Sequence, residues 1–228
     1  MSDMQLNLDN IDLLNTNNSL HEFFHIIQNF GKRNIKEIEP TTKNIIFEGD
    51  LSIVINESVN LIFKELNKGE DRKIIKQHIL NYINNHKIIL QEVYNWLLNN
   101  QNNSNSIYLL GYFNYHGIET IINKQKAFEL YQKASELENS VAQLDLADMY
   151  IYGKGVDKDY NKAFELYKKS AEYEHSYGII GLGYCYFNGI GTSINKQKAF
   201  ELYQKAADLG NNVAQHNLAL MYQHGNWN

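Results

Sequence analysis

The feature that most constrains this chain is a string of twelve residues that occurs twice. Asn-Lys-Gln-Lys-Ala-Phe-Glu-Leu-Tyr-Gln-Lys-Ala occupies residues 123–134 and returns unchanged at 195–206, 72 positions later. A variant at 159–170 lies midway between the two copies, so the period is 36 residues. A fixed period of this length predicts a stack of supersecondary units, each of which buries its apolar face only against its neighbours. Such a stack favours a binding scaffold over a catalyst.

Each unit carries the signals of two helices. In the first, helix A, a recurring leucine is followed by a small residue, which allows a second helix to approach closely. Seven positions after the leucine comes a glycine suited to the left-handed residue that ends a helix. Asn123, Asp159 and Asn195 then stand where the N-cap of a second helix, helix B, is required. Two antiparallel helices per unit predict an all-α solenoid. The spans expected for helix A are 104–116, 140–152, 176–188 and 212–224.

The repeated pattern resembles the Sel-one-like repeat (SLR), a tetratricopeptide-like family. The resemblance covers residues 103–228, as repeats at about 104–139, 140–175 and 176–211 and a partial repeat at 212–228. It implies a right-handed α-solenoid of antiparallel helix pairs. The matching residues of the middle copy are Ala142, Leu146, Ala147, Tyr150, Gly153, Gly155, Val156, Asp159, Lys162, Ala163, Leu166, Tyr167, Lys168, Lys169 and Ala171.

The resemblance also implies where a partner binds, because helix A lines the concave groove of tetratricopeptide-like solenoids. The groove positions lie two residues before the recurring leucine and two, five and six residues after it. Tyrosine is enriched at interface hot spots, so such a groove suits a peptide segment of another protein. The alternative is that these aromatic residues only stack on one another, as apolar stripes in helices commonly do. The candidate partner-binding residues are Tyr108, Tyr112, Tyr115, His116, Asp148, Tyr152, Tyr184, Phe187, Asn188, His216 and His224.

Residues 1–102 do not keep the period but carry helical patterns. Ser19 and Glu22 form a capping box, and amphipathic patterns follow between residues 50 and 69, from 71 to 83, and from 88 to 97. We expect a helical region that either forms a small bundle of its own or caps the first repeat. It resembles the segment that precedes SLR arrays in fungal chains with an upstream kinase-like domain. No kinase motif occurs here, so the chain would keep only the interaction part of such a protein.

Composition excludes several classes of function. The net charge of −5 is divided nearly evenly between the two halves, so neither offers the basic field that nucleic acids require. A single cysteine, Cys185, excludes an intramolecular disulfide framework and a cysteine-rich metal site. No secretion signal and no stretch of about 18 apolar residues are present, so we expect a cytoplasmic protein without membrane insertion. No cofactor is expected.

One motif points to catalysis. His21-Glu22-Phe23-Phe24-His25 fits the pattern in which two imidazoles bind zinc and the glutamate acts as general base. However, only 20 residues precede His21, too few for the upstream part of a metalloprotease cleft, and Glu22 already serves as the capping-box partner of Ser19. We therefore expect no catalytic and no metal-binding residue, and a zinc peptidase is the rival hypothesis.

The favoured function is a non-catalytic scaffold or adaptor that binds a segment of another protein in the groove, within a signalling assembly. The SLR resemblance offers an alternative, regulation of a cell-wall chitin synthase.

A further expectation concerns the incomplete fourth repeat. Its helix A lacks a helix B, so an exposed apolar face on Leu218, Met221 and Tyr222 would promote self-association.

Overall fold

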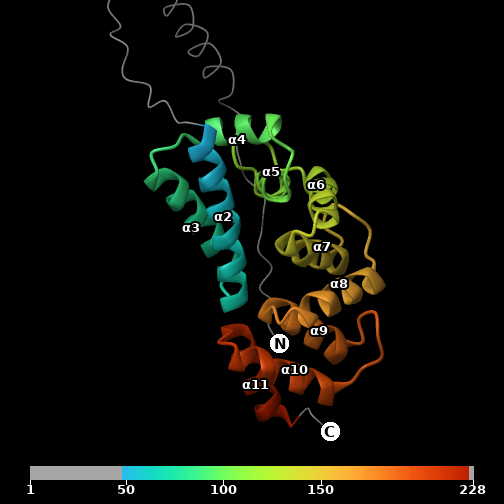
Figure 1. The fold of residues 1–228 in the computed structure, drawn as a ribbon. Helices are drawn as coiled ribbons and strands as arrows, with labels where there is room; N and C mark the ends of the chain where they lie inside the picture. Colours follow the sequence, from blue (N-terminus) through green and yellow to red (C-terminus); the bar gives the residue numbers. More distant parts are fainter. Residues whose placement is uncertain (1–47, 226–228) are drawn as a thin grey trace, which may run out of the picture. The chain divides into compact units, whose positions relative to one another are not determined.

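A computed structural model describes residues 48–225 of the chain, which belong to one compact unit spanning residues 46–228. The capping box at Ser19 and the His21-Glu22-x-x-His25 motif lie outside the described residues. Between residues 48 and 225 the backbone forms helices and no strand. The helices are α2 (Glu48–Lys68), α3 (Arg72–Asn85), α4 (Leu90–Asn99), α5 (Ser104–His116), α6 (Lys124–Glu136), α7 (Ser140–Tyr152), α8 (Tyr160–Glu172), α9 (Ser176–Asn188), α10 (Lys196–Asp208) and α11 (Asn212–His224) (Figure 1).

The array of helix pairs confirms the predicted all-α solenoid. Helices α5, α7, α9 and α11 have the bounds expected for helix A, and α6, α8 and α10 are the three helices B. The N-cap side chains of Asn123, Asp159 and Asn195 each accept a hydrogen bond from a backbone N–H three residues on, which satisfies a donor that the helix itself leaves unpaired. The helices A each end at a left-handed glycine: Gly117, Gly153, Gly189 and Gly225.

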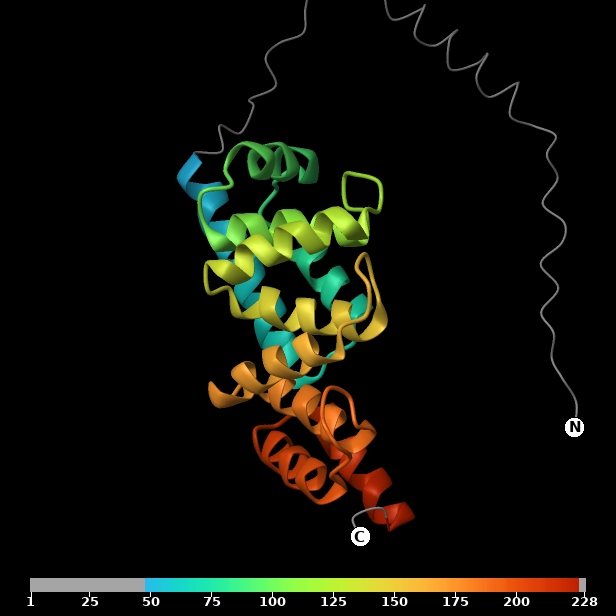
Figure 2. The same ribbon diagram turned by 90° about the vertical axis from the view of Figure 1, so that its right-hand side faces the viewer.

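Successive helices of the array pack on one another from α5 to α11 (Figure 2). The phenylalanine of each repeated string contacts the tyrosine of the following helix A edge to face, the geometry that aromatic pairs prefer. Ring centroids in these pairs are 5.5 to 5.6 Å apart, and the planes are nearly perpendicular. The same aromatic contact therefore recurs at each of these junctions between units. The pairs are Phe128–Tyr150, Phe164–Tyr186 and Phe200–Tyr222.

Helix α2 packs along the array and is not part of a separate bundle. It contacts α5, α7 and α9, so it passes three of the four helices A (Figure 1). Ile55, Ile62 and Leu66 of α2 are fully buried, in one apolar cluster with residues of α3, α4 and the first repeats. Burying side chains of this size contributes about 1.5–3 kcal/mol each, so the contact is a substantial part of the core. The division of the chain at residue 102 stays a prediction.

The fourth repeat corrects one expectation. Leu218 and Met221 are buried against α10 and do not form an exposed apolar face, because helix A packs on the preceding helix B as well as on its own. Tyr222 is 60% exposed while its ring contacts Phe200.

Within the described residues, no helix is both long enough and apolar enough to cross a membrane.

The loop glycine Gly191 gives a test of how tightly the repeats stack. It has a φ of +65°, and a Cβ there would meet the backbone carbonyl of Tyr160 and lie 2.8 Å from the Cβ of Phe164. Gly210 has a similar φ of +83° but no atom within 4 Å of such a Cβ. Both alanine substitutions carry the left-handed strain of about 1–2 kcal/mol, and only Gly191→Ala adds overpacking of about 1–3 kcal/mol. We expect urea denaturation, followed by circular dichroism, to show the larger loss for Gly191→Ala. Equal losses would contradict the close contact between repeats.

Candidate partner-binding groove

The helix A face of the array is partly covered by the chain's own α2. The side-chain amide of Asn105, in the first turn of α5, donates to Oδ1 of Asn56 over 2.8 Å. At the other end of α2, the carbonyl of Asn67 accepts from the hydroxyl of Ser176 and from the amide of Asn211, at the starts of α9 and α11. Helix α2 therefore lies across the N-terminal ends of the helices A, and leaves their C-terminal halves to form the groove.

Arg72, the first residue of α3, joins the start of that helix to α7. Its Nη1 lies 2.6 Å from Oδ1 of Asp145 and its Nη2 lies 2.7 Å from Oδ2 of Asp148, both on α7. The guanidinium also lies over the ring of Tyr177, 5.3 Å from its centroid. Arginine suits such a place because its planar, weakly hydrated cation can bond two carboxylates and stack on a ring at once.

Tyrosine hydroxyls complete the hydrogen bonding of the two aspartates. Tyr108 donates to Asp145 over 2.9 Å, and Tyr177 donates to Asp148 over 2.8 Å. Tyr167 also donates to Asp148. Burial raises the pKa of Asp145 despite the opposing effect of Arg72, and burial raises the pKa of Tyr108 and of Tyr167. The phenols therefore remain donors at neutral pH, as a buried carboxylate requires.

The predicted groove residues of the first repeat are largely covered. Tyr108 and Tyr112 are 0% and 1% exposed, and their rings pack on each other, on Tyr131 and on His116. For these two tyrosines the alternative interpretation, stacking, describes the structure. Tyr115 and His116 are partly buried and line a cavity of about 130 Å³ that also contains Arg72.

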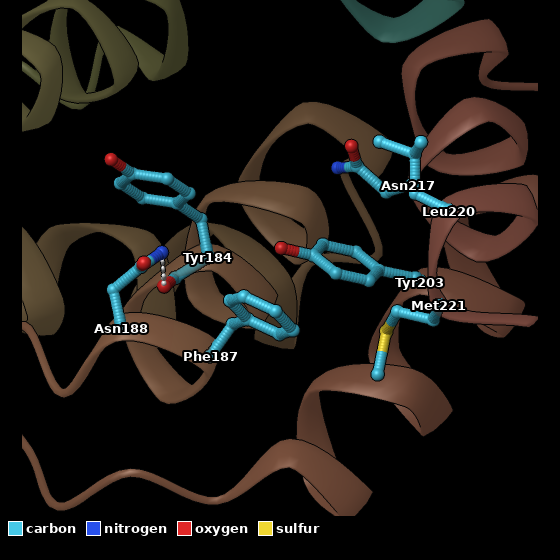
Figure 3. A pocket seen from close by; sticks show the side chains of 7 residues that line it. All are labelled: Tyr184, Phe187, Asn188, Tyr203, Asn217, Leu220 and Met221. Carbon is cyan, nitrogen blue, oxygen red and sulfur yellow. Dashed lines mark hydrogen bonds between the residues drawn. The ribbon is translucent and has the colours of Figure 1, made fainter. Parts of the chain in front are cut away.

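The open part of the groove lies along α7, α9 and α11. A cavity of about 510 Å³, the larger cavity, is lined by the turn from Gly69 to Arg72 and by groove residues that include Asp148, Tyr152 and Tyr184. A cavity of about 290 Å³, the smaller cavity, shares Tyr184 and Asn217 with it. In Figure 3, the α9 side chains face those of α11, with the ring of Tyr203 between them. The smaller cavity is lined by Tyr184, Phe187, Asn188, Tyr203, Asn217, Leu220 and Met221.

Two predicted residues lie on the last helix. His216 is exposed on α11, and His224 is the final residue of that helix. Their role in binding stays a prediction, as does that of the other groove residues.

Helix B contributes to the groove, which sequence reasoning did not anticipate. The tyrosine of each repeated string lines one of the three groove cavities. Tyr131 lines the cavity of about 130 Å³, Tyr167 lines the larger cavity, and Tyr203 lines the smaller cavity. The groove was expected to be lined by helix A. The small residue after the recurring leucine was the available signal, because at Gly111 and Gly183 the absence of a Cβ leaves room for the rings of Tyr131 and Tyr203.

Arg72 and Asp145 were also missed. Arg72 lies in the part of the chain without the repeat register, and Asp145 is not among the family's groove positions. The signal was two carboxylates one turn apart, Asp145 and Asp148, in an otherwise apolar helix. Buried carboxylates need a cation or several donors, and Arg72 is one of only two arginines in the chain.

Two further features of this part of the chain concern metal ligands and the cysteine. Among residues 48–225, no three or more His, Cys, Asp and Glu side chains are grouped so that they could hold a metal ion. Cys185 is buried on α9, and burial raises the pKa of its thiol to about 12, so it stays protonated and acts as a small apolar side chain.

Comparisons with known proteins agree with this architecture. The model of the Sel1 repeat matches residues 104–139, 140–172, 176–211 and 212–227. A Sel1 repeat protein from Oxalobacter formigenes is 31% identical, with a TM-score of 0.56 over 63% of this chain and 58% of that one. The protective antigen c5321 of uropathogenic Escherichia coli, which displays an SLR fold, is 21% identical with a TM-score of 0.56, over 78% of this chain and 42% of that one, and shows the fold alone.

The helix pairs and their period define an α-solenoid, a class of helical repeat protein. The chain belongs to the Sel1 repeat family, which confirms the resemblance seen in the sequence. Proteins with this repeat generally mediate protein–protein interactions on a non-catalytic fold. The chain spans less than two thirds of the length of both structures. A comparison with curated proteins found no match.

The Arg72 contact should be essential for stability. Arg72→Ala leaves Asp145 buried without its cation, and breaking such a pair costs about 3–5 kcal/mol. We expect a large fall in the urea midpoint, with part of it recovered when Asp145→Asn is added, because the amide oxygen still accepts from Tyr108. If the double variant is no more stable than Arg72→Ala, the buried charge is not the cause.

His116 should make stability depend on pH. Burial, with Lys76, Arg72 and Lys154 nearby, lowers its pKa from 6.5 to about 3. The unfolded chain therefore binds the proton first, and stability that is fully present above about pH 6.5 is lost as the pH falls toward 3. Between pH 7.5 and 5, the urea midpoint of the His116→Gln variant should fall less than that of the unmodified chain. A His216→Gln variant, altered at an exposed histidine, is the matched control.

Proposed function

We propose that this chain is a non-catalytic scaffold or adaptor that binds a segment of a partner protein in the open part of the groove. The observation that carries this proposal is the pair of adjoining cavities along α7, α9 and α11. Both are lined by the helix A positions expected to bind, together with the helix B tyrosines.

The exposure of the lining side chains supports the proposal. Tyr152, Tyr184 and Leu220 are 53%, 37% and 40% exposed, so these lining side chains can be reached by a ligand from solvent. Tyrosine buries a large area on binding with few rotatable bonds to fix, so it commonly anchors an interface. Helix α2 already fills the N-terminal side of the groove, so the partner would be held on the C-terminal halves of the helices A.

Site-specific crosslinking tests this proposal. A photo-crosslinking amino acid placed at position 184 of the full chain should form an adduct with a discrete partner in an extract of the native cell. The same amino acid at Tyr173, which is 63% exposed and lines neither cavity, is the matched control. Adducts that form equally at both positions, or only at 173, would count against the groove.

Mass spectrometry of the adduct would also separate the narrower hypotheses. A signalling protein would favour the adaptor role, and a cell-wall synthase would favour regulation of chitin synthesis.

A further inference from the structure

The charged groups that line the larger cavity are mostly acidic. Glu70, Asp71 and Asp148 contribute three carboxylates, and Arg72 contributes one guanidinium. That guanidinium is already held between Asp148 and the neighbouring Asp145. The residues that line the smaller cavity carry no formal charge. The open groove therefore combines a negative section with an apolar and amide section.

Glu70 and Asp71 are placed to meet a ligand. Both lie in the turn between α2 and α3, which forms one wall of the larger cavity. Asp71 uses Oδ1 to cap α3 through the backbone N–H of Lys73, and its side chain is exposed. The turn is held in place by Arg72 and by the contacts of Asn67, so these carboxylates are carried on a fixed wall.

Aromatic rings of the same groove already hold cations from this chain. The guanidinium of Arg72 lies over Tyr177, and the ammonium of Lys154 lies 4.9 Å from the ring centroid of Tyr152. Lys196 lies 5.9 Å from the centroid of Phe187. Each is within the distance at which a cation is attracted to a ring face. These contacts show that cationic side chains pack on the aromatic rings of the groove.

We propose that the open groove recognises a basic segment of the partner, with an arginine or lysine side chain in the larger cavity. The cation would lie among Glu70, Asp71 and the ring of Tyr184, and apolar side chains next to it would enter the smaller cavity beside Phe187 and Leu220. This inference rests on the proposed function and adds the charge of the ligand. Opposite charge on the two surfaces also speeds encounter, consistent with the net charge of −5.

A selection on the full chain tests the proposal. Random twelve-residue peptides displayed on phage would be selected against the immobilised protein, and the enriched sequences would be synthesised and measured by fluorescence anisotropy. We expect enrichment in arginine and lysine next to apolar residues. Binding should be lost in Tyr184→Ala, and should weaken as sodium chloride is raised.

Charge-removing variants sharpen the test. The double variant Glu70→Gln, Asp71→Asn keeps the size of both side chains, and asparagine still caps α3. Removing two solvent-facing ion pairs should weaken the selected peptides about two- to thirty-fold. Lys154→Gln removes a competing cation and should tighten binding. The matched control, Glu165→Gln with Glu172→Gln on the exposed side of α8, should leave affinity unchanged. Circular dichroism and urea midpoints confirm that each variant is folded.

The outcomes separate the two proposals. Peptides that need Tyr184 but are neutral or acidic would overturn the basic ligand and leave the groove as the binding site. Peptides that bind equally well to Tyr184→Ala, or a selection that yields no binder, would overturn both. Basic peptides whose affinity does not change in the Glu70→Gln, Asp71→Asn variant would overturn the role of these carboxylates.

Discussion

The close approach of the two helices in each repeat is the constraint on which the rest of the structure depends. A Cβ at Gly111 would lie 2.7 Å from the ring of Tyr131, and one at Gly183 would lie 2.8 Å from the ring of Tyr203. The rings occupy the space that a larger residue on helix A would fill. Because the helices approach closely, the tyrosine of helix B passes beside helix A and reaches the groove. Stacking and groove chemistry thus arise from the same contact.

The second requirement is a charge balance within the helix A face. The desolvation of Asp145 and Asp148 in a packed helix is offset by Arg72 and by three tyrosine hydroxyls that surround the two carboxylates. This cluster ties α3 to the middle of the array, across 76 residues of sequence. It also determines which part of the groove stays open, since the turn that carries Arg72 becomes a wall of the larger cavity.

The period made the array predictable, and the absence of a period left the rest undetermined. Helix A bounds followed from a recurring leucine and a terminal glycine, because each signal is local and occurs four times. The amphipathic pattern of α2 showed that one face is buried, but no local signal says that its partners are α5, α7 and α9. For the same reason Tyr108 and Tyr112, at groove positions by register, are covered by the chain itself. Register places a residue on a face, and tertiary packing decides whether that face is open.

The shared origin of the groove tyrosines has a consequence for how such a protein can change. Tyr131, Tyr167 and Tyr203 come from the repeated string, whereas the walls beside them come from helices A that differ from copy to copy. Duplicating one 36-residue unit would lengthen the groove and add a further helix B tyrosine to it in the same step. The walls of the new unit could then diverge without disturbing the stacking, so that binding specificity and fold stability are altered by different residues.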